Sequence, residues 1–181
     1  MVVKLKDIMT TKLQTIDENK SVYEAAKKMK KVSSLLVKRR GKIYGIITDT
    51  DIVKRVVAKG LDPKKVKVKD IVSTPLITLD ENEDVRKASY VMMKRGIKRI
   101  VVTRNGRVVG IVTATDIARY VPNYLDLIEM GKKYAGVERP ILEDLEDELL
   151  IGMCEECANL TSDLKLVNGR WLCEDCRGEW K

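Results

Sequence analysis

The sequence predicts an α/β protein made of two tandem β-α-β-β-α repeats, packed together as a pseudo-dimer, with a small metal-bound β ribbon at the C-terminal end. Three observations predict it: a motif that occurs twice, apolar positions that switch between helical and strand periods within each copy, and four cysteines confined to the last 28 residues. We expect residues 1–63 and 64–122 to form the repeats, 123–150 linker helices and 151–181 the ribbon.

An internal repeat is the main evidence for two similar domains. Its matching segments lie 63 residues apart early in each copy and 65 residues apart at the end. The pairs are Lys6–Thr10 with Lys69–Ser73, Thr15–Asn19 with Thr78–Asn82, and Gly45–Asp51 with Gly110–Asp116. A unit of about 60 residues buries little apolar surface alone, so we expect the two copies to pack against each other.

The first copy predicts a helix, a hairpin and a second helix. The run from Val22 to Met29 places apolar residues at i, i+3, i+4 and i+7, and Ser21 begins a capping box. Apolar runs at 35–37 and 43–47 predict two strands joined at Arg40-Gly41. A helical pattern resumes at Asp51. Each copy is therefore expected to form a β-α-β-β-α unit.

The second copy repeats these elements. Apolar strands at 100–102 and 108–112 are joined by Asn105-Gly106, a strong signal for a tight hairpin turn, and a helical pattern resumes at Asp116. Between the repeats and the cysteines, we expect an acidic amphipathic helix with an apolar stripe formed by Ile141, Leu142, Leu145 and Leu149.

Composition narrows the functional class. Hydrophobic residues make up 44% of the 181 residues and charged residues 34%, as in a folded protein. The chain has no histidine, which excludes hydrolases with an imidazole base, and it shows no catalytic constellation, so we expect no enzymatic activity. With no apolar run of about 18 residues and no secretory signal, we expect a cytoplasmic protein without a membrane span.

Charge is distributed unevenly along the chain. Residues 1–120 carry 28 Lys and Arg against 13 Asp and Glu, a net charge of +15, and residues 121–181 carry 7 against 14, a net charge of −7. The basic part suits nucleic acid, nucleotides or an anionic partner, and a solvated, lysine-rich surface is the plain alternative.

The doubled pattern resembles the cystathionine-β-synthase-type (CBS) domain, here as a pair. The resemblance rests on the D-I-M-T opening at Asp7–Thr10 and on the Gly-apolar-apolar-Thr-x-x-Asp ending of each copy, and it covers residues 1 to about 122. It implies two clefts that bind adenosine-containing ligands, regulation of an attached partner without chemistry of its own, and a homodimer.

The Thr-x-x-Asp segments are the candidate nucleotide site. A hydroxyl and a carboxylate beside the first amides of a helix suit phosphate and ribose, and the resemblance assigns phosphate to Thr48 and Thr113 and ribose to Asp51 and Asp116. The alternative is that each pair only caps its helix.

Two basic residues extend the candidate nucleotide site in the second repeat. Lys98 and Arg99 stand before a strand where the first repeat has Ser33 and Ser34, so the second cleft is the better candidate for a charged phosphate. Solvated surface charges are the alternative reading of this pair.

The four cysteines predict a metal site. Cys154 and Cys157 form one C-x-x-C pair and Cys173 and Cys176 another, with a hairpin between them that turns at Asn168-Gly169. This spacing brings four thiolates into tetrahedral geometry, and disulfides are the alternative. The segment resembles zinc ribbons and rubredoxin-like domains, so zinc is the expected metal and iron the alternative. Glu155 and Glu156 add negative charge, which disfavours a phosphate backbone here.

These observations predict a regulatory protein in which the CBS pair senses an adenosine nucleotide or related anion, and the zinc ribbon engages a protein partner. One alternative is a nucleic-acid-binding protein that uses the basic surface, which salt-dependent binding would support. The other is electron transfer through an iron-loaded ribbon, which a red colour would reveal.

Overall fold

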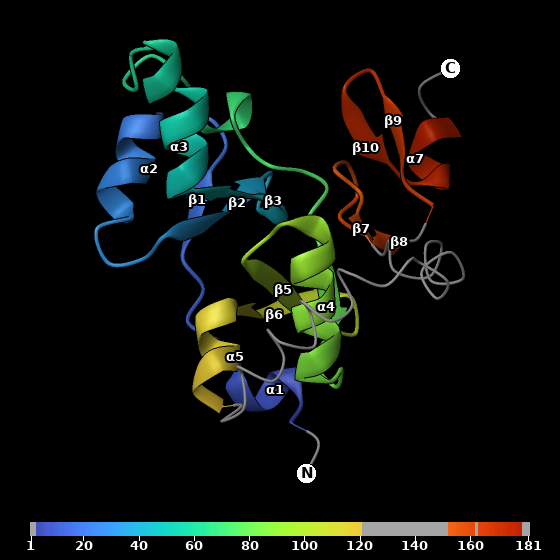
Figure 1. Cartoon of the computed structure of the whole chain (residues 1–181). Helices are drawn as coiled ribbons and strands as arrows, with labels where there is room; N and C mark the ends of the chain where they lie inside the picture. Colours follow the sequence, from blue (N-terminus) through green and yellow to red (C-terminus); the bar gives the residue numbers. More distant parts are fainter. Residues whose placement is uncertain (1–2, 121–151, 162, 179–181) are drawn as a thin grey trace, which may run out of the picture. The chain divides into compact units, whose positions relative to one another are not determined.

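The computed structural model describes residues 3–120, 152–161 and 163–178 (Figure 1). They divide into two compact units: residues 3–11 with 78–120, and residues 12–77 with the C-terminal residues 152–161 and 163–178. The linker helices expected at 123–150, with their apolar stripe, lie outside the described residues.

The first repeat has the predicted β-α-β-β-α order. Its sheet has the strand order β1-β2-β3, in which β1 pairs parallel with β2 and β2 pairs antiparallel with β3. The elements are β1 (Thr15–Asp17), α2 (Val22–Lys28), β2 (Ser34–Arg39), β3 (Lys42–Thr48) and α3 (Asp49–Arg55), followed by the short 3-10 turn η1 (Val57–Lys59). The 3-10 turn η2 (Val68–Asp70), from the start of the second repeat, lies in the same compact unit.

The second repeat has the same topology, with the strand order β4-β5-β6. Its elements are β4 (Thr78–Asp80), α4 (Val85–Arg95), β5 (Arg99–Arg104), β6 (Arg107–Thr113) and α5 (Ala114–Tyr120), and α1 (Leu5–Ile8), from the start of the first repeat, lies in the same compact unit. The two hairpins match in detail, because the register shifts between Val37 and Lys38 in one and between Val102 and Thr103 in the other. The shared bulge supports the repeat as a structural duplication.

The hairpin turns form where the sequence predicts them. Asn105 and Gly106 both have positive φ values, 49° and 74°, as do Arg40 and Gly41 in the first repeat, 48° and 80°. Positive φ at both central residues matches the right-handed twist of the flanking strands. The following helices begin at Asp49 and Ala114, two residues earlier than predicted, because the threonine that ends each strand caps the helix directly.

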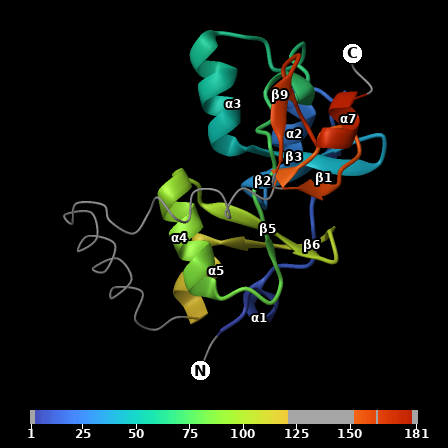
Figure 2. The same ribbon diagram turned by 90° about the vertical axis from the view of Figure 1, so that its right-hand side faces the viewer.

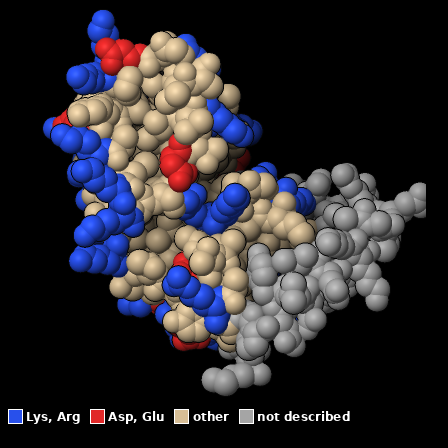
Figure 3. Space-filling view, turned by 60° about the vertical axis from the view of Figure 1, so that its left-hand side comes forward, with Lys and Arg blue, Asp and Glu red and all other residues tan. Residues whose placement is uncertain are grey.

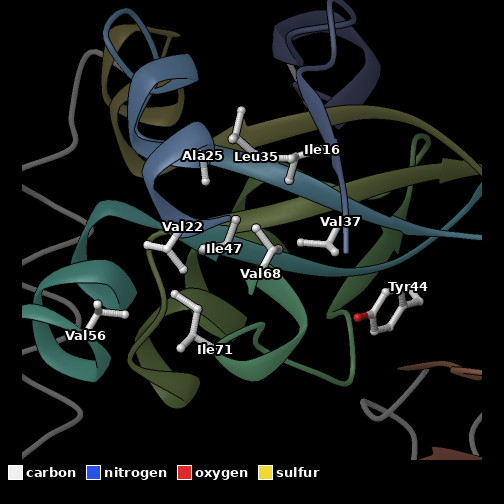
Figure 4. Close-up of a cluster of buried hydrophobic side chains, with 10 residues drawn as sticks. All are labelled: Ile16, Val22, Ala25, Leu35, Val37, Tyr44, Ile47, Val56, Val68 and Ile71. Atoms are coloured by element: carbon white, nitrogen blue, oxygen red, sulfur yellow. The ribbon is translucent and has the colours of Figure 1, made fainter. Parts of the chain in front are cut away.

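A buried apolar cluster fills the space between the first sheet and its helices (Figure 4). Strand residues that alternate toward this side meet helix residues spaced three and four apart, which is the pattern that the sequence predicted. The cluster consists of Ile16, Val22, Ala25, Leu35, Val37, Tyr44, Ile47, Val56, Val68 and Ile71.

The segment that opens each repeat packs with the other repeat. We call residues 3–10 and 66–73 the leading segments. Residues 3–10 donate and accept backbone hydrogen bonds with Glu81, Glu83, Val85 and Ile111 of the second repeat, and residues 66–73 do the same at Glu18, Lys20, Val22 and Ile46 of the first. The compact units therefore do not follow the boundaries of the sequence repeat.

A glycine makes each of these contacts possible. A Cβ on Gly45 would lie 2.5 Å from Val72 Cγ2 and 3.0 Å from the Ser73 carbonyl oxygen, and a Cβ on Gly110 would lie 2.5 Å from Met9 Sδ. The glycine of the Gly-apolar-apolar-Thr motif is thus required by the close approach of the leading segment.

The C-terminal residues 152–161 and 163–178 form a small unit that we call the cysteine ribbon, and it belongs to the same compact unit as the first repeat (Figure 2). It contains the predicted hairpin, with its turn at Asn168 and Gly169. Its elements are β7 (Gly152–Met153), β8 (Leu160–Thr161), β9 (Lys165–Val167), β10 (Arg170–Leu172) and α7 (Glu174–Gly178). No helix in the described ranges is long and apolar enough to cross a membrane.

We expect Gly45→Ala to lower the free energy of unfolding by about 1–3 kcal/mol, because the new methyl group meets a backbone carbonyl that cannot move alone. Gly110→Ala should cost less, because the two nearest atoms, Met9 Sδ and Cγ, belong to a flexible side chain that can rotate, although Met9 Cβ stays 3.1 Å away. Urea denaturation measures both, with Gly178→Ala as the control, since nothing lies within 4 Å of that position. A Gly45→Ala protein as stable as the unmodified protein would contradict the role of this contact.

Candidate functional sites

The first Thr-x-x-Asp segment lies where β3 turns into α3. Asp51 Oδ2 accepts hydrogen bonds from the Thr48 amide, at 2.9 Å, and from Thr48 Oγ1, at 2.7 Å, and the Asp51 amide donates to Thr48 Oγ1 at 3.2 Å. The pair forms a reciprocal capping box, which was the alternative reading of these residues. Capping occupies one carboxylate oxygen of Asp51 and leaves the other for further contacts.

The second segment has the same geometry. Asp116 Oδ2 accepts from the Thr113 amide at 2.9 Å and from Thr113 Oγ1 at 2.7 Å, and the Asp116 amide donates back at 3.2 Å. All four predicted residues are half-buried. The structure therefore brings each threonine together with its aspartate within its own repeat.

The two repeats differ at the second oxygen of the aspartate. Asp51 Oδ1 accepts from Ser73 Oγ at 3.2 Å and pairs with Arg55 at 3.3 Å. Arg55 also donates to the carbonyl oxygens of Ile71, at 2.7 Å, and Val72, at 3.2 Å, so it ties the leading segment to α3. In the second repeat Tyr120 stands at the position of Arg55, and within the described residues Asp116 Oδ1 has no hydrogen-bond partner.

The sequence interpretation missed Arg55 and Ser73. Ser73 ends the repeated D-I-V-S motif, and its equivalent Thr10 ends D-I-M-T, so the repeat itself held a signal that a hydroxyl belongs there. Lys98, by contrast, is exposed, and Arg99 is half-buried at the start of β5. The backbone carbonyl of Lys98 accepts from the Ala114 amide beside the capping box, which places this residue next to the second segment.

The four cysteines come together as predicted. Their Sγ atoms all lie within 4.8 Å of one another, and those of Cys157 and Cys173 are 3.7 Å apart. Four sulfurs around a zinc ion with Zn–S bonds of about 2.3 Å are separated by about 3.8 Å. Cys154, Cys173 and Cys176 are buried and Cys157 is half-buried, and all four are free thiols. The donor set and its spacing fit a tetrahedral divalent metal ion.

Backbone amides favour the thiolate form of Cys154. Burial alone raises the pKa of this thiol, but the amides of Cys157, Cys173 and Glu156 hydrogen-bond to it and lower its pKa to about 7. Burial raises the pKa of Cys157 and of Cys176, so those sulfurs are protonated at neutral pH without a metal. Metal binding must then release protons from the cluster.

The acidic residues of the first C-x-x-C pair are compensated by basic residues. Glu156 pairs with Arg170 and, at 3.2 Å, with Arg40, and Arg170 holds the pKa of the Glu156 carboxyl below its usual range. Glu155 lies 3.9 Å from Arg39. Arg170 of the ribbon and two arginines of the first repeat, Arg39 and Arg40, thus compensate the negative charge of Glu155 and Glu156.

Basic side chains dominate the face shown in Figure 3, where Lys and Arg clearly outnumber acidic residues. On α2, Tyr23 is 41% exposed, and the ammonium groups of Lys27 and Lys64 lie 5.2 and 5.5 Å from its ring centroid. An exposed aromatic ring flanked by cations is a feature that nucleic-acid-binding surfaces use.

Comparison with known proteins gives a consistent family match. The model of the CBS domain family matches residues 5–58 and 68–123. An uncharacterized protein of Methanopyrus kandleri is 34% identical over 145 residues, which cover 80% of this chain and 74% of that protein. A solved CBS domain protein of unknown function from Thermoplasma acidophilum has a TM-score of 0.66 and covers 92% of this chain and 88% of its own, and at 23% identity the likeness concerns the fold alone.

A second structure is of interest for its metal content. Hypoxic response protein 1 of Mycobacterium tuberculosis is 30% identical over 122 residues, 66% of this chain and 85% of that protein. A solved structure of Hypoxic Response Protein I, with two coordinated zinc ions, is 29% identical, has a TM-score of 0.58 and covers 66% of this chain and 100% of its own.

We expect Ala158→Gly to stabilise the cysteine ribbon by about 1 kcal/mol, because Ala158 has a φ of 59° and only glycine adopts this conformation without a Cβ clash. Both tryptophans of the chain lie at 171 and 180, so urea denaturation followed by tryptophan fluorescence reports on this region. Gly169→Ala, at a φ of 76°, serves as the control and should destabilise it. A loss of stability in Ala158→Gly would contradict the prediction.

Proposed function

The chain belongs to the CBS-domain family, and we propose that it is a regulatory protein whose repeats bind an adenosine-containing nucleotide and whose cysteine ribbon binds a structural zinc ion. CBS-domain proteins are generally regulatory and ligand-binding, and those of this type are mostly not enzymes. The observation that carries the proposal is the duplicated threonine–aspartate pair at the end of β3 and of β6.

The second repeat is the stronger nucleotide site. Asp116 keeps one carboxylate oxygen without a partner in the described structure, and this oxygen is able to accept a ribose hydroxyl. Asp51 must first give up Ser73 or Arg55. Lys98 and Arg99 add positive charge beside the second site, which suits the phosphate of a nucleotide. We therefore assign Thr113 and Asp116 to the primary site and Thr48 and Asp51 to a weaker one.

Zinc is the proposed occupant of the cysteine cluster. Cys154, Cys157, Cys173 and Cys176 offer four sulfurs at distances that suit a closed tetrahedral site, and such a site has a structural rather than a catalytic role. When bound, the ion would supply folding energy to a segment too small to form a core of its own. Iron is the alternative, and an iron-loaded ribbon would carry electrons instead.

The proposal includes two kinds of partner. CBS domains commonly bind small-molecule ligands and form oligomers, and for this chain we propose a homodimer. The cysteine ribbon is proposed to engage a further protein. The exposed Tyr23 ring, with the ammonium groups of Lys27 and Lys64 near it, favours nucleic acid as the second candidate ligand, and an affinity that falls steeply with salt concentration would distinguish it.

We expect Asp116→Ala to weaken the binding of AMP, ADP or ATP by about tenfold or more, because a charged acceptor for ribose is lost. Asp51→Ala should have a smaller effect, since Asp51 is already engaged. Isothermal titration calorimetry of the full chain measures both. Asp84→Ala is the control, because it also removes a helix N-cap but lies outside the two segments. Equal nucleotide affinities of Asp116→Ala and unmodified protein would argue against the assignment.

We expect protein purified without added metal to carry one zinc ion per chain in native mass spectrometry and to be colourless. Cys157→Ser should lose the ion, whereas Lys165→Ala, an exposed change in β9, should keep it. A red protein with sulfur-to-iron absorption would replace zinc with iron. If neither the unmodified protein nor Lys165→Ala carries a metal ion, the proposed metal site is refuted.

A further inference from the structure

We propose that metal binding by the cysteine ribbon is coupled through Arg39 to the β2–β3 hairpin, so that loading the four cysteines tightens the hairpin of the first repeat but not that of the second. The inference rests on the proposed metal site and identifies the β2–β3 hairpin as the part of the same chain to which metal binding is coupled. It concerns contacts inside one compact unit, which contains both the first repeat and the ribbon.

Arg39, at the end of β2, is the centre of a largely buried group. Its Nε lies 2.7 Å from Glu18 Oε2, and its guanidinium lies 4.2 Å from the centroid of the Tyr44 ring. Tyr44 donates its hydroxyl to the same Glu18 oxygen at 3.0 Å, and burial raises the pKa of Tyr44, so this hydroxyl keeps its proton. Glu18, in the loop after β1, and Tyr44, in β3, therefore hold the Arg39 side chain in place.

Glu155, which follows the first cysteine, connects this group to the ribbon. Its Oε2 lies 3.9 Å from Arg39, its Oε1 accepts from the Trp171 amide at 3.1 Å, and its own amide donates to the Trp171 carbonyl at 2.9 Å. The Glu155 side chain is only 5% exposed. A buried carboxylate of this kind requires a cation, and Arg39 is the one that the first repeat provides.

Two more basic residues of the hairpin contact the same C-x-x-C pair. Arg40 pairs with Glu156 at 3.2 Å, and Lys42 Nζ donates to the carbonyl oxygen of Cys157 at 3.0 Å. Three cations from the end of one hairpin thus contact the three residues that follow Cys154. Arg40 and Lys42 belong to the turn region, so the ribbon contacts the end of the hairpin at which β2 turns into β3.

The metal makes this contact depend on the order of the C-x-x-C pair. A structural metal ion supplies folding free energy to a ribbon too small to form a core of its own, so it fixes the residues that directly follow Cys154. The basic residues of the hairpin therefore have partners at fixed positions when the cluster is loaded and lose them when the empty ribbon loosens. By thermodynamic reciprocity, the same contacts raise the affinity of the cluster for its metal.

The second repeat supplies an internal comparison. Arg104 and Glu81 stand at the positions of Arg39 and Glu18 and form the same ion pair, with Arg104 Nε 2.5 Å from Glu81 Oε1. Val109 replaces Tyr44, however, and the Arg104 side chain is 57% exposed, against 23% for Arg39. In the described part of the chain, no second carboxylate pairs with Arg104. The additional contacts are specific to the first repeat.

The coupled strand ends at a candidate nucleotide residue. β3 begins at Lys42, which contacts the ribbon, and ends at Thr48, which caps α3 and binds Asp51. A change in the order of the hairpin therefore reaches the weaker nucleotide site in the first repeat, while the site at Thr113 and Asp116 lies on a hairpin without this contact.

Hydrogen–deuterium exchange of the full chain, with zinc bound and after removal by a chelator, tests the coupling without a substitution. We expect amides of residues 36–48 to exchange faster after zinc removal and those of residues 101–113 to be unchanged. Equal effects on the two hairpins, or no effect on either, would overturn the inference while leaving the metal site intact.

A pair of matched variants tests the role of Arg39. We expect Arg39→Met to weaken zinc binding by about tenfold in competition with a chromophoric chelator, and Arg104→Met to leave it unchanged. Arg39→Lys, which keeps the charge, should recover part of the loss. Identical zinc affinities of the two methionine variants would overturn the inference. A protein that binds no zinc or iron would refute the proposed metal site, and the coupling with it.

Discussion

The close approach of each leading segment to a glycine in the last strand of the opposite repeat is the constraint on which the rest of the structure depends. Ser73 and Ile46 exchange backbone hydrogen bonds in one unit, and Thr10 and Ile111 do so in the other. The contact places Ile71 in the first core. It also brings the Ser73 hydroxyl to Asp51, so the same packing that completes the fold completes the candidate site.

The repeats share one fold and differ at the residues of the candidate sites. In the first repeat Arg55 pairs with Asp51. Arg39, which packs on the Tyr44 ring, contacts Glu155 of the cysteine ribbon. The second repeat leaves one oxygen of Asp116 without a partner in the part of the chain described. Duplication has thus given one domain that is suited to internal contacts and one that is suited to a ligand.

Local patterns in the sequence predicted local structure well. The β-α-β-β-α order, the turn at Asn105-Gly106 and the gathering of the four cysteines follow from periodicity, turn chemistry and spacing, which act over a few residues or through one ion. The sequence did not predict the residues that pair with the leading segments or with Glu155 and Glu156. Hydrophobic periodicity and the sign of a charge do not specify which residues, distant in the sequence, a segment will contact. The helices begin early for a local reason, since threonine caps more directly than the apolar pattern indicates.

The crossed placement of the leading segments also affects how the chain matures on the ribosome. Residues 3–10 emerge first but have no partner until residues 78–120 have been made, and the first repeat is completed only when residues 66–73 and then the C-terminal ribbon arrive. Neither unit is contiguous in the sequence. Neither compact unit can therefore assemble fully until the later of its two segments has been synthesised.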